Sequence, residues 1–97
     1  MAMFIVLGNF TEQGIRTIKE SPKRSDAFKA LAAKAGVKVK DIYWTLGHYD
    51  IVTIVEAPDT ATATSLGLAI AALGNVRTET LTAFSAEEFG KILAKMP

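Results

Sequence analysis

The order of strand-like and helix-like segments restricts this chain to few folds. Four apolar runs rich in β-branched residues predict β-strands, at residues 3–7, 39–46, 51–57 and 76–84. Apolar residues at helical spacing separate the first strand from the second and the third from the fourth. The link Gly47-His48-Tyr49-Asp50 between the middle strands has the length of a hairpin loop. The predicted order is β-α-β-β-α-β, the ferredoxin-like sandwich of the α+β class.

Residues typical of helix starts and ends agree with this order. Ser21 and Pro22 predict the start of the first main helix, with the serine as its cap, and Gly36 predicts its end. Asp59 is expected to cap the second main helix. The stretch Ser85-Ala86-Glu87-Glu88 is a capping box, so a short C-terminal helix should follow the last strand.

Apolar residues occupy both faces of the predicted strands. In the first strand Phe4 and Val6 alternate with Ile5 and Leu7, and in the second we expect Val39 and Tyr43 to oppose Ile42, Trp44 and Leu46. Right-handed crossovers place both main helices on one face of the sheet, which leaves the other face uncovered. A soluble monomer rarely exposes an apolar patch of that kind. We therefore expect a homodimer or higher homo-oligomer in which two sheets meet face to face.

Composition excludes several classes of protein. A chain of 97 residues is expected to form a single domain, spanning residues 1–97. It contains no cysteine, which removes disulfides and thiolate metal sites. A net charge of +1 argues against nucleic-acid binding. Neither a signal peptide nor a membrane-spanning segment is expected, and we predict a cytoplasmic location with no membrane partner.

The loop between the second and third strands carries the candidate site residues. We interpret Trp44, His48, Tyr49 and Asp50 as candidate ligand-binding residues, with no catalytic residue identified. Asp50 could equally fix the turn through backbone N–H groups, and His48 could simply be exposed. A single histidine without neighbouring ligands predicts no metal site. The glycines form no nucleotide-binding motif, so no cofactor is expected.

Several short stretches carry a family resemblance that covers about residues 4 to 90. They are Val6-Leu7-Gly8-Asn9-Phe10-Thr11, Gly14-Ile15-Arg16, Ser21-Pro22-Lys23-Arg24, Gly47-His48-Tyr49-Asp50, Ile54-Val55-Glu56-Ala57-Pro58 and Gly74-Asn75-Val76-Arg77-Thr78. With them the chain resembles the GYD domain family, of the dimeric α/β-barrel group. His48 departs from that family's three-letter motif because it is inserted between glycine and tyrosine. The loop and following strand also resemble the ligand-sensing domains of Lrp/AsnC-type regulators, which bind small molecules between subunits near that turn.

Three functional interpretations follow. The first is a non-enzymatic, oligomeric module that binds a small molecule or has a regulatory role. The second is a cofactor-free oxygenase or isomerase of the dimeric α/β-barrel type, with Asp50, His48 or a tyrosine as base. The third is an adaptor that binds another protein through a basic helix face carrying Lys23, Arg24 and Lys29.

Overall fold

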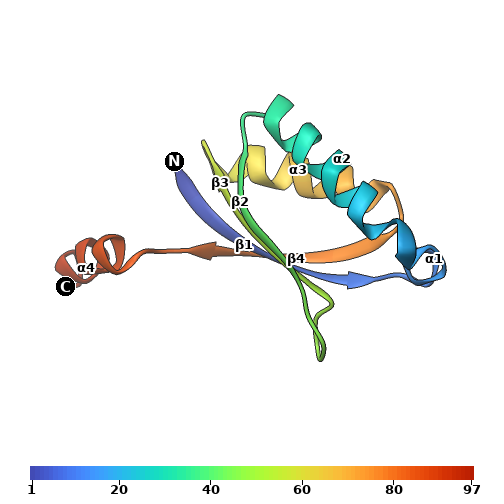
Figure 1. Cartoon of the computed structure of the whole chain (residues 1–97). Coiled ribbons are helices and arrows are strands. Elements are labelled where there is room, and N and C mark those ends of the chain that lie inside the picture. The colour runs from blue at the N-terminus through green and yellow to red at the C-terminus, as the bar shows by residue number, and fades with distance from the viewer.

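One antiparallel sheet with two helices on one side forms the body of the molecule (Figure 1). The computed structural model describes all 97 residues. The strands are β1 (Ala2–Phe10), β2 (Lys38–Trp44), β3 (Ile51–Ala57) and β4 (Val76–Ala83), and they lie in the order β2-β3-β1-β4. Every neighbouring pair is antiparallel. This four-stranded sheet with its helices is consistent with the predicted ferredoxin-like α+β fold.

The helices begin and end close to the predicted signals. They are α1 (Glu12–Arg16), the 3-10 helix η1 (Ile18–Glu20), α2 (Ser21–Lys34), α3 (Thr60–Ala72) and α4 (Ala86–Ala94). Asp59 caps α3 by accepting a hydrogen bond from the N–H of Thr62. Both bonds of the predicted capping box join Ser85 and Glu88 at the start of α4.

The predicted cap at Ser21 is wrong. The chain enters α2 directly from η1, so Ser21 already has helical backbone angles and lies within the helix. Its hydroxyl instead accepts a hydrogen bond from Arg24. A short 3-10 turn often precedes an α-helix, and here it replaces a side-chain cap.

A bulge in β2 changes which of its residues share a face. Val39 pairs with Val55, but the next pair joins Asp41 to Ile54, so Lys40 has no cross-strand partner. Val39, Ile42 and Trp44 consequently all lie on the helix side of the sheet. Tyr43 lies on the opposite face. The predicted alternation, with Val39 on the face of Tyr43, is wrong because an inserted residue shifts the two-residue period.

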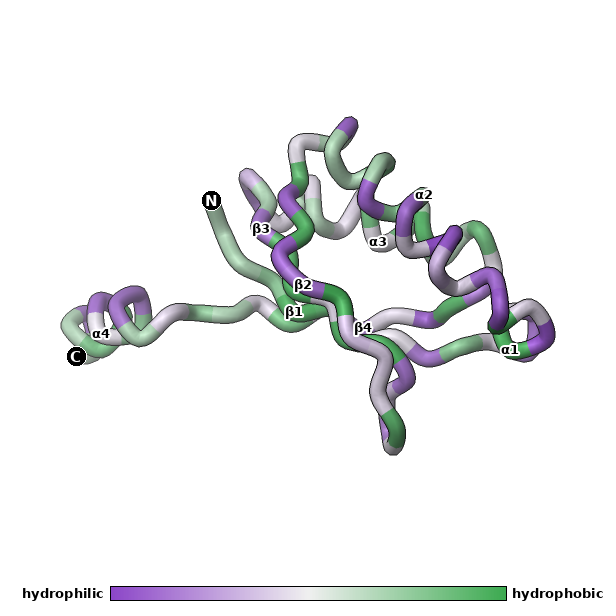
Figure 2. The backbone as a smooth tube through the Cα atoms, viewed as in Figure 1, coloured by the Kyte–Doolittle hydropathy of each residue, from purple (hydrophilic) through white to green (hydrophobic).

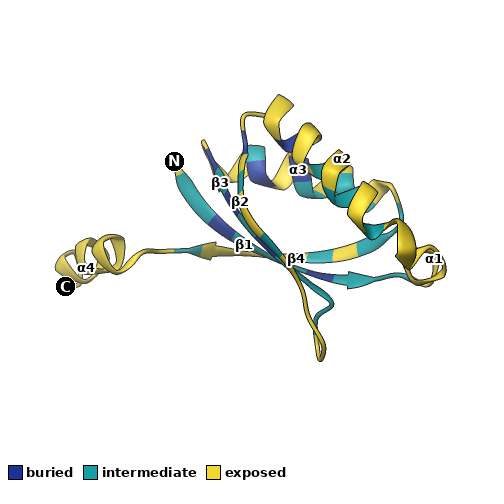
Figure 3. Ribbon diagram, in the orientation of Figure 1, coloured by how far each residue is buried: buried dark blue, intermediate teal, exposed yellow.

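The hydrophobic core is small and lies toward one end of the layer between helices and sheet. It comprises the buried side chains of Phe4, Ala32, Val37, Val55, Ala57, Ala63 and Leu66. They come from the first half of β1, the last half of β3, the end of α2, the link between α2 and β2, and the first half of α3 (Figure 3). Only 10 of the 97 residues are buried, so much apolar surface lies outside this core.

Helix α4 lies apart from the body of the molecule. Figure 1 shows it beyond the end of β4, with no other element beside it. The arm it forms makes the chain elongated, with extents of 50 × 31 × 19 Å. The radius of gyration is 14.5 Å, whereas a compact chain of this length would have about 12.5 Å.

Candidate functional site

A cavity separates the sheet from the two main helices beside the core, with which it shares Val55, Ala63 and Leu66. Its volume is about 180 Å³. Of its 21 lining residues, 13 are hydrophobic. They include Val6 and Phe10 of β1, Phe28 of α2, and Leu66 and Ile70 of α3. The cavity is therefore an apolar cleft whose floor is the sheet and whose walls are α2 and α3.

The cavity contains few polar groups. Arg24 is its one ionisable lining residue, and the guanidinium group of Arg24 is already occupied. It donates hydrogen bonds to the carbonyl oxygens of Thr17 and Gly14 at 3.0 and 3.2 Å. The lining includes no carboxylate, histidine or tyrosine. The cleft thus offers space for an apolar molecule but no group suited to general-base catalysis.

Among the predicted site residues, Trp44 alone lines this cavity. It stands at the end of β2, about half exposed. His48 is exposed in the β2–β3 loop, which projects away from the helices (Figure 1). Its ring packs edge-on against that of Tyr49, with 6.0 Å between ring centroids. The four predicted residues therefore do not converge on one pocket.

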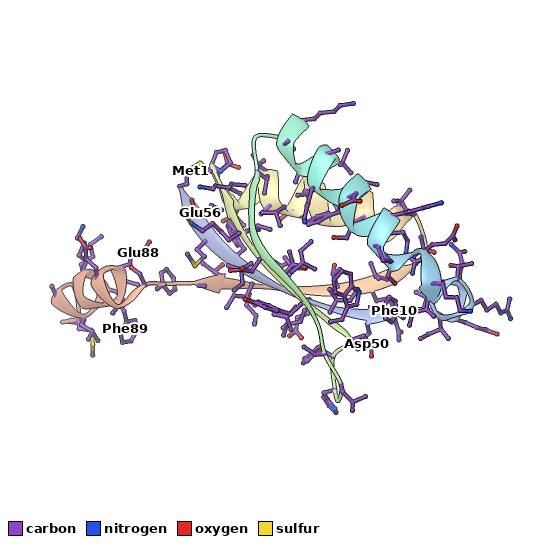
Figure 4. All side chains as sticks on the ribbon, in the orientation of Figure 1. Met1, Phe10, Asp50, Glu56, Glu88 and Phe89 are labelled. Carbon is purple, nitrogen blue, oxygen red and sulfur yellow. The ribbon has the colours of Figure 1, made fainter.

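Asp50 joins the loop to the end of β1. Its Oδ2 accepts a hydrogen bond from the backbone N–H of Phe10 at 3.0 Å, and Figure 4 shows the two side by side. The backbone N–H of Asp50 donates to the carbonyl oxygen of Gly8 at 2.9 Å. These bonds extend the pairing of β3 with β1 by one residue. They match the structural interpretation of Asp50, in which its carboxylate accepts a backbone N–H.

Tyr49 reaches from the loop to the edge strand β4. Its hydroxyl donates a hydrogen bond to Glu79 Oε2 at 2.8 Å. This hydrogen bond and the negative charge of Glu79 raise the pKa of the Tyr49 phenol above its ordinary value. The contact ties the β2–β3 loop to β4 across the end of β1.

The face of the sheet without helices is apolar at its centre. Met3, Ile5 and Leu7 of β1 lie there beside Val52 and Ile54 of β3, all half-buried. We call this surface the open face. Leu81 and Tyr43 extend it on the outer strands and are exposed. The sequence correctly predicts this second apolar face.

Helix α4 presents a second uncovered apolar surface. Phe89, Ile92 and Leu93 share one side of the helix, and Phe84 and Met96 flank it. All five are exposed (Figure 3), and Figure 4 shows Phe89 projecting from α4 with no other element beside it. The hydropathy colours of Figure 2 show hydrophobic and hydrophilic residues alternating around this isolated helix. An amphipathic helix of this kind normally buries its apolar side.

Sequence reasoning missed three residues that shape the site. Thr53 is a buried residue on the cavity floor, and Gly67 of α3 lies in the cavity wall. Gly14 of α1 approaches the turn before β4 so closely that an added Cβ would lie 2.0 Å from the carbonyl oxygen of Asn75. The sequence held two signals that could have identified them. One is a polar residue within the apolar run Ile51–Ala57, and the other is a glycine within a helical pattern.

The structure contains no group of three or more His, Cys, Asp and Glu side chains that could hold a metal ion. None of its helices is long and apolar enough to cross a membrane.

Comparison with known proteins identifies the family. The chain matches the GYD domain family over residues 4–93, nearly its whole length. It belongs to the GYD domain family. A relative from Thermus thermophilus is 40% identical over 84 residues, which cover 86% of this chain and 88% of the relative. That protein is named glutamine synthetase and cystathionine beta-lyase binding protein.

A solved structure supports the fold of this GYD domain protein. The crystal structure of TTHA0845, also from Thermus thermophilus, superposes with a TM-score of 0.58 at 28% sequence identity. The match covers 89% of this chain and 96% of TTHA0845. The predicted resemblance to the GYD family is thus confirmed.

Proposed function

We propose that this GYD domain protein is a homo-oligomeric module that binds metabolic enzymes. The observation that supports this proposal most strongly is that the chain has two apolar surfaces, the open face and α4, which its own elements leave uncovered. The name of the Thermus relative supports protein binding, because that protein is described as binding two enzymes. The partners proposed for this chain are enzymes of the same kind, glutamine synthetase and cystathionine beta-lyase.

The amount of exposed surface supports assembly. The accessible surface of the chain is 6605 Å². A compact monomer of 10.4 kDa is expected to expose about 5,400 Å². The excess, about 1,200 Å², exceeds the roughly 800 Å² that each partner contributes to an interface of standard size. A second copy could cover the open face and α4 together, because both surfaces are present on every chain and a twofold axis makes the contacts reciprocal.

The outer face of α2 is the proposed contact for the enzyme. Lys23, Lys29 and Lys34 are exposed on this helix. Arg24, which the sequence assigned to the same face, points inward and donates hydrogen bonds to Thr17. The cationic residues of this face are therefore lysines, with the exposed Asp26 between Lys23 and Lys29. The face remains accessible when the opposite side of the sheet is covered.

Calorimetric titration of the purified protein into glutamine synthetase, and separately into cystathionine beta-lyase, tests the proposal. We expect saturable binding to at least one enzyme. The double variant Lys23→Glu/Lys29→Glu should weaken it at least tenfold. The control Arg16→Glu/Lys19→Glu changes the net charge equally but lies on α1 and η1, outside α2, α4 and the open face, and should bind as the wild type does. Absence of binding to both enzymes would contradict the proposal.

Small-molecule binding is a second candidate function, and the cavity is the observation that favours it. The predicted site at Trp44, His48, Tyr49 and Asp50 enters this proposal mainly through Trp44, which lines the cavity. A role for the other three would require a ligand held at the loop, at the seam between subunits.

A further inference from the structure

Thr53 presents a buried hydroxyl to the cavity. It lies at the middle of β3, is 7% exposed, and has the apolar cross-strand neighbours Val6 and Ile42. Its hydroxyl takes part in none of the side-chain hydrogen bonds of the chain. No fully inaccessible side-chain polar atom lacks a partner, so the hydroxyl opens into the cavity that Thr53 lines. It is therefore free to form a hydrogen bond with a molecule that enters the cavity.

Gly67 keeps the cavity open from the opposite wall. It lies inside α3, where glycine weakens a helix relative to alanine. A Cβ added at Gly67 would meet no atom within 4 Å. Gly14 differs, because the backbone of Asn75 excludes any side chain there. The chain itself therefore gives no steric reason for glycine at position 67.

We propose that this cavity binds an uncharged small molecule about the size of one aromatic ring, with a hydrogen-bonding group that meets Thr53. The volume of about 180 Å³ slightly exceeds the roughly 150 Å³ of an apolar protein cavity that holds benzene. Gly67 leaves room for the ring. Thr53 supplies the one lining hydroxyl of the two central strands, whereas the other lining hydroxyls lie on α2 and the edge strand β4. The inference rests on the second candidate function and is independent of enzyme binding.

The charge of the ligand follows from Arg24. An anionic group in an apolar cleft needs a cation to pair with. Arg24 is the one ionisable group of the lining, and its guanidinium already donates to the carbonyl oxygens of Thr17 and Gly14. Its Nη1 and Nη2 groups also donate to the hydroxyls of Thr17 and Ser21, so a carboxylate would have to use the remaining Nε–H or displace these bonds, and we expect a neutral ligand.

Titrations of the full-length protein with phenol, benzene and benzoate, followed by two-dimensional NMR, test the inference. We expect phenol to saturate with a Kd below about 1 mM and benzene to bind about tenfold more weakly, since it lacks the hydrogen bond. Benzoate should not bind. Shifted amides should belong to β3, α2 and α3 around the cavity. Failure of phenol and benzene to saturate at millimolar concentration would overturn the inference.

Three variants separate the roles of the two residues. Thr53→Val preserves side-chain shape, and it should make phenol bind no better than benzene. Gly67→Leu fills the cavity and should abolish binding of both probes. Gly90→Ala, a helical glycine of α4 away from the cavity, should bind as the wild type does.

Two further results would refute the proposal. One is unchanged phenol affinity in Thr53→Val, which also decides the matter if Gly67→Leu fails to fold. The other is wild-type phenol binding by a folded Gly67→Leu protein. Enzyme binding is proposed for another surface of the protein. If phenol and benzene do not bind but the enzymes do, only the proposed ligand site is rejected.

Discussion

Two helical glycines should respond in opposite ways to the same added methyl group. Gly67→Ala places a Cβ in open space on the cavity side of α3, whereas Gly14→Ala places one 2.0 Å from the carbonyl oxygen of Asn75. Helix propensity alone would predict a gain at both positions. The comparison therefore tests whether the cavity is real, because only the surroundings of the two positions differ.

The expected magnitudes follow from these surroundings. At Gly67, alanine gains about 1 kcal/mol of helix propensity. Partial burial of the methyl group adds about 0.5 kcal/mol. A total of about 1.5 kcal/mol should raise the melting temperature by about 6–12 °C in a domain of this size. At Gly14 the backbone of Asn75 cannot move aside without breaking the hydrogen bond from the N–H of Thr11 to its carbonyl oxygen, so overpacking should cost about 3 kcal/mol.

Differential scanning calorimetry and urea unfolding of both variants provide the measurement. Equal urea m-values would show that the two variants unfold from equally compact native states. A melting temperature that falls in Gly67→Ala would refute the reasoning, because it would mean that a side chain or backbone atom already fills the space beside Gly67. A gain of stability in Gly14→Ala would refute the close approach of α1 to the turn before β4.

Three other predictions concern the loop and the C-terminal arm. Asp50→Ala should cost about 1–2 kcal/mol in urea unfolding, because the backbone N–H at the end of β1 loses its acceptor. The Tyr49 phenol should titrate above the ordinary tyrosine pKa in ultraviolet absorbance, and Glu79→Gln should lower that pKa. Because the folded-state pKa is raised, the stabilisation is complete below the ordinary tyrosine pKa and is lost as pH rises through the raised value. Phe89→Ser/Leu93→Ser should dissociate the proposed homo-oligomer in sedimentation velocity without changing the fold at high dilution, and an unchanged sedimentation coefficient would reject a role for α4 in assembly.

Periodicity and capping residues were sufficient to predict the element order and most boundaries. Asp59, Ser85 and Glu88 make the cap contacts that their positions predict, because capping depends on residues within one turn of helix. The bulge at Lys40 could not be predicted, since the strand period fixes faces only while every residue is paired. The prediction of Ser21 as a helix cap failed because η1 runs directly into α2. Like the bulge, this 3-10 turn is a local irregularity that the sequence pattern does not show.

The site was harder to predict than the fold. The aromatic residues and Asp50 led us to predict a site in the β2–β3 loop. The cavity instead lies between the sheet and the helices α2 and α3, on the face opposite the open face. Its defining features are an unfilled volume and an unpaired hydroxyl at Thr53, and both depend on how α2 and α3 settle on the sheet. A sequence pattern identifies residues that face inward but does not reveal whether they fill the space between them.

The position of the cavity beside one end of the core has a consequence for motion. Amide protons near Phe4, Ala32 and Ala57, which belong to the core but not to the cavity lining, lie where packing is dense and should exchange with solvent only on global unfolding. Those in the first turns of α2 and the last turns of α3 border the cavity and should exchange through smaller, more frequent openings. The sheet would then act as a fixed base on which the helix pair hinges from its packed end. Such opening would give a molecule from solution a path to Thr53 without unfolding the chain.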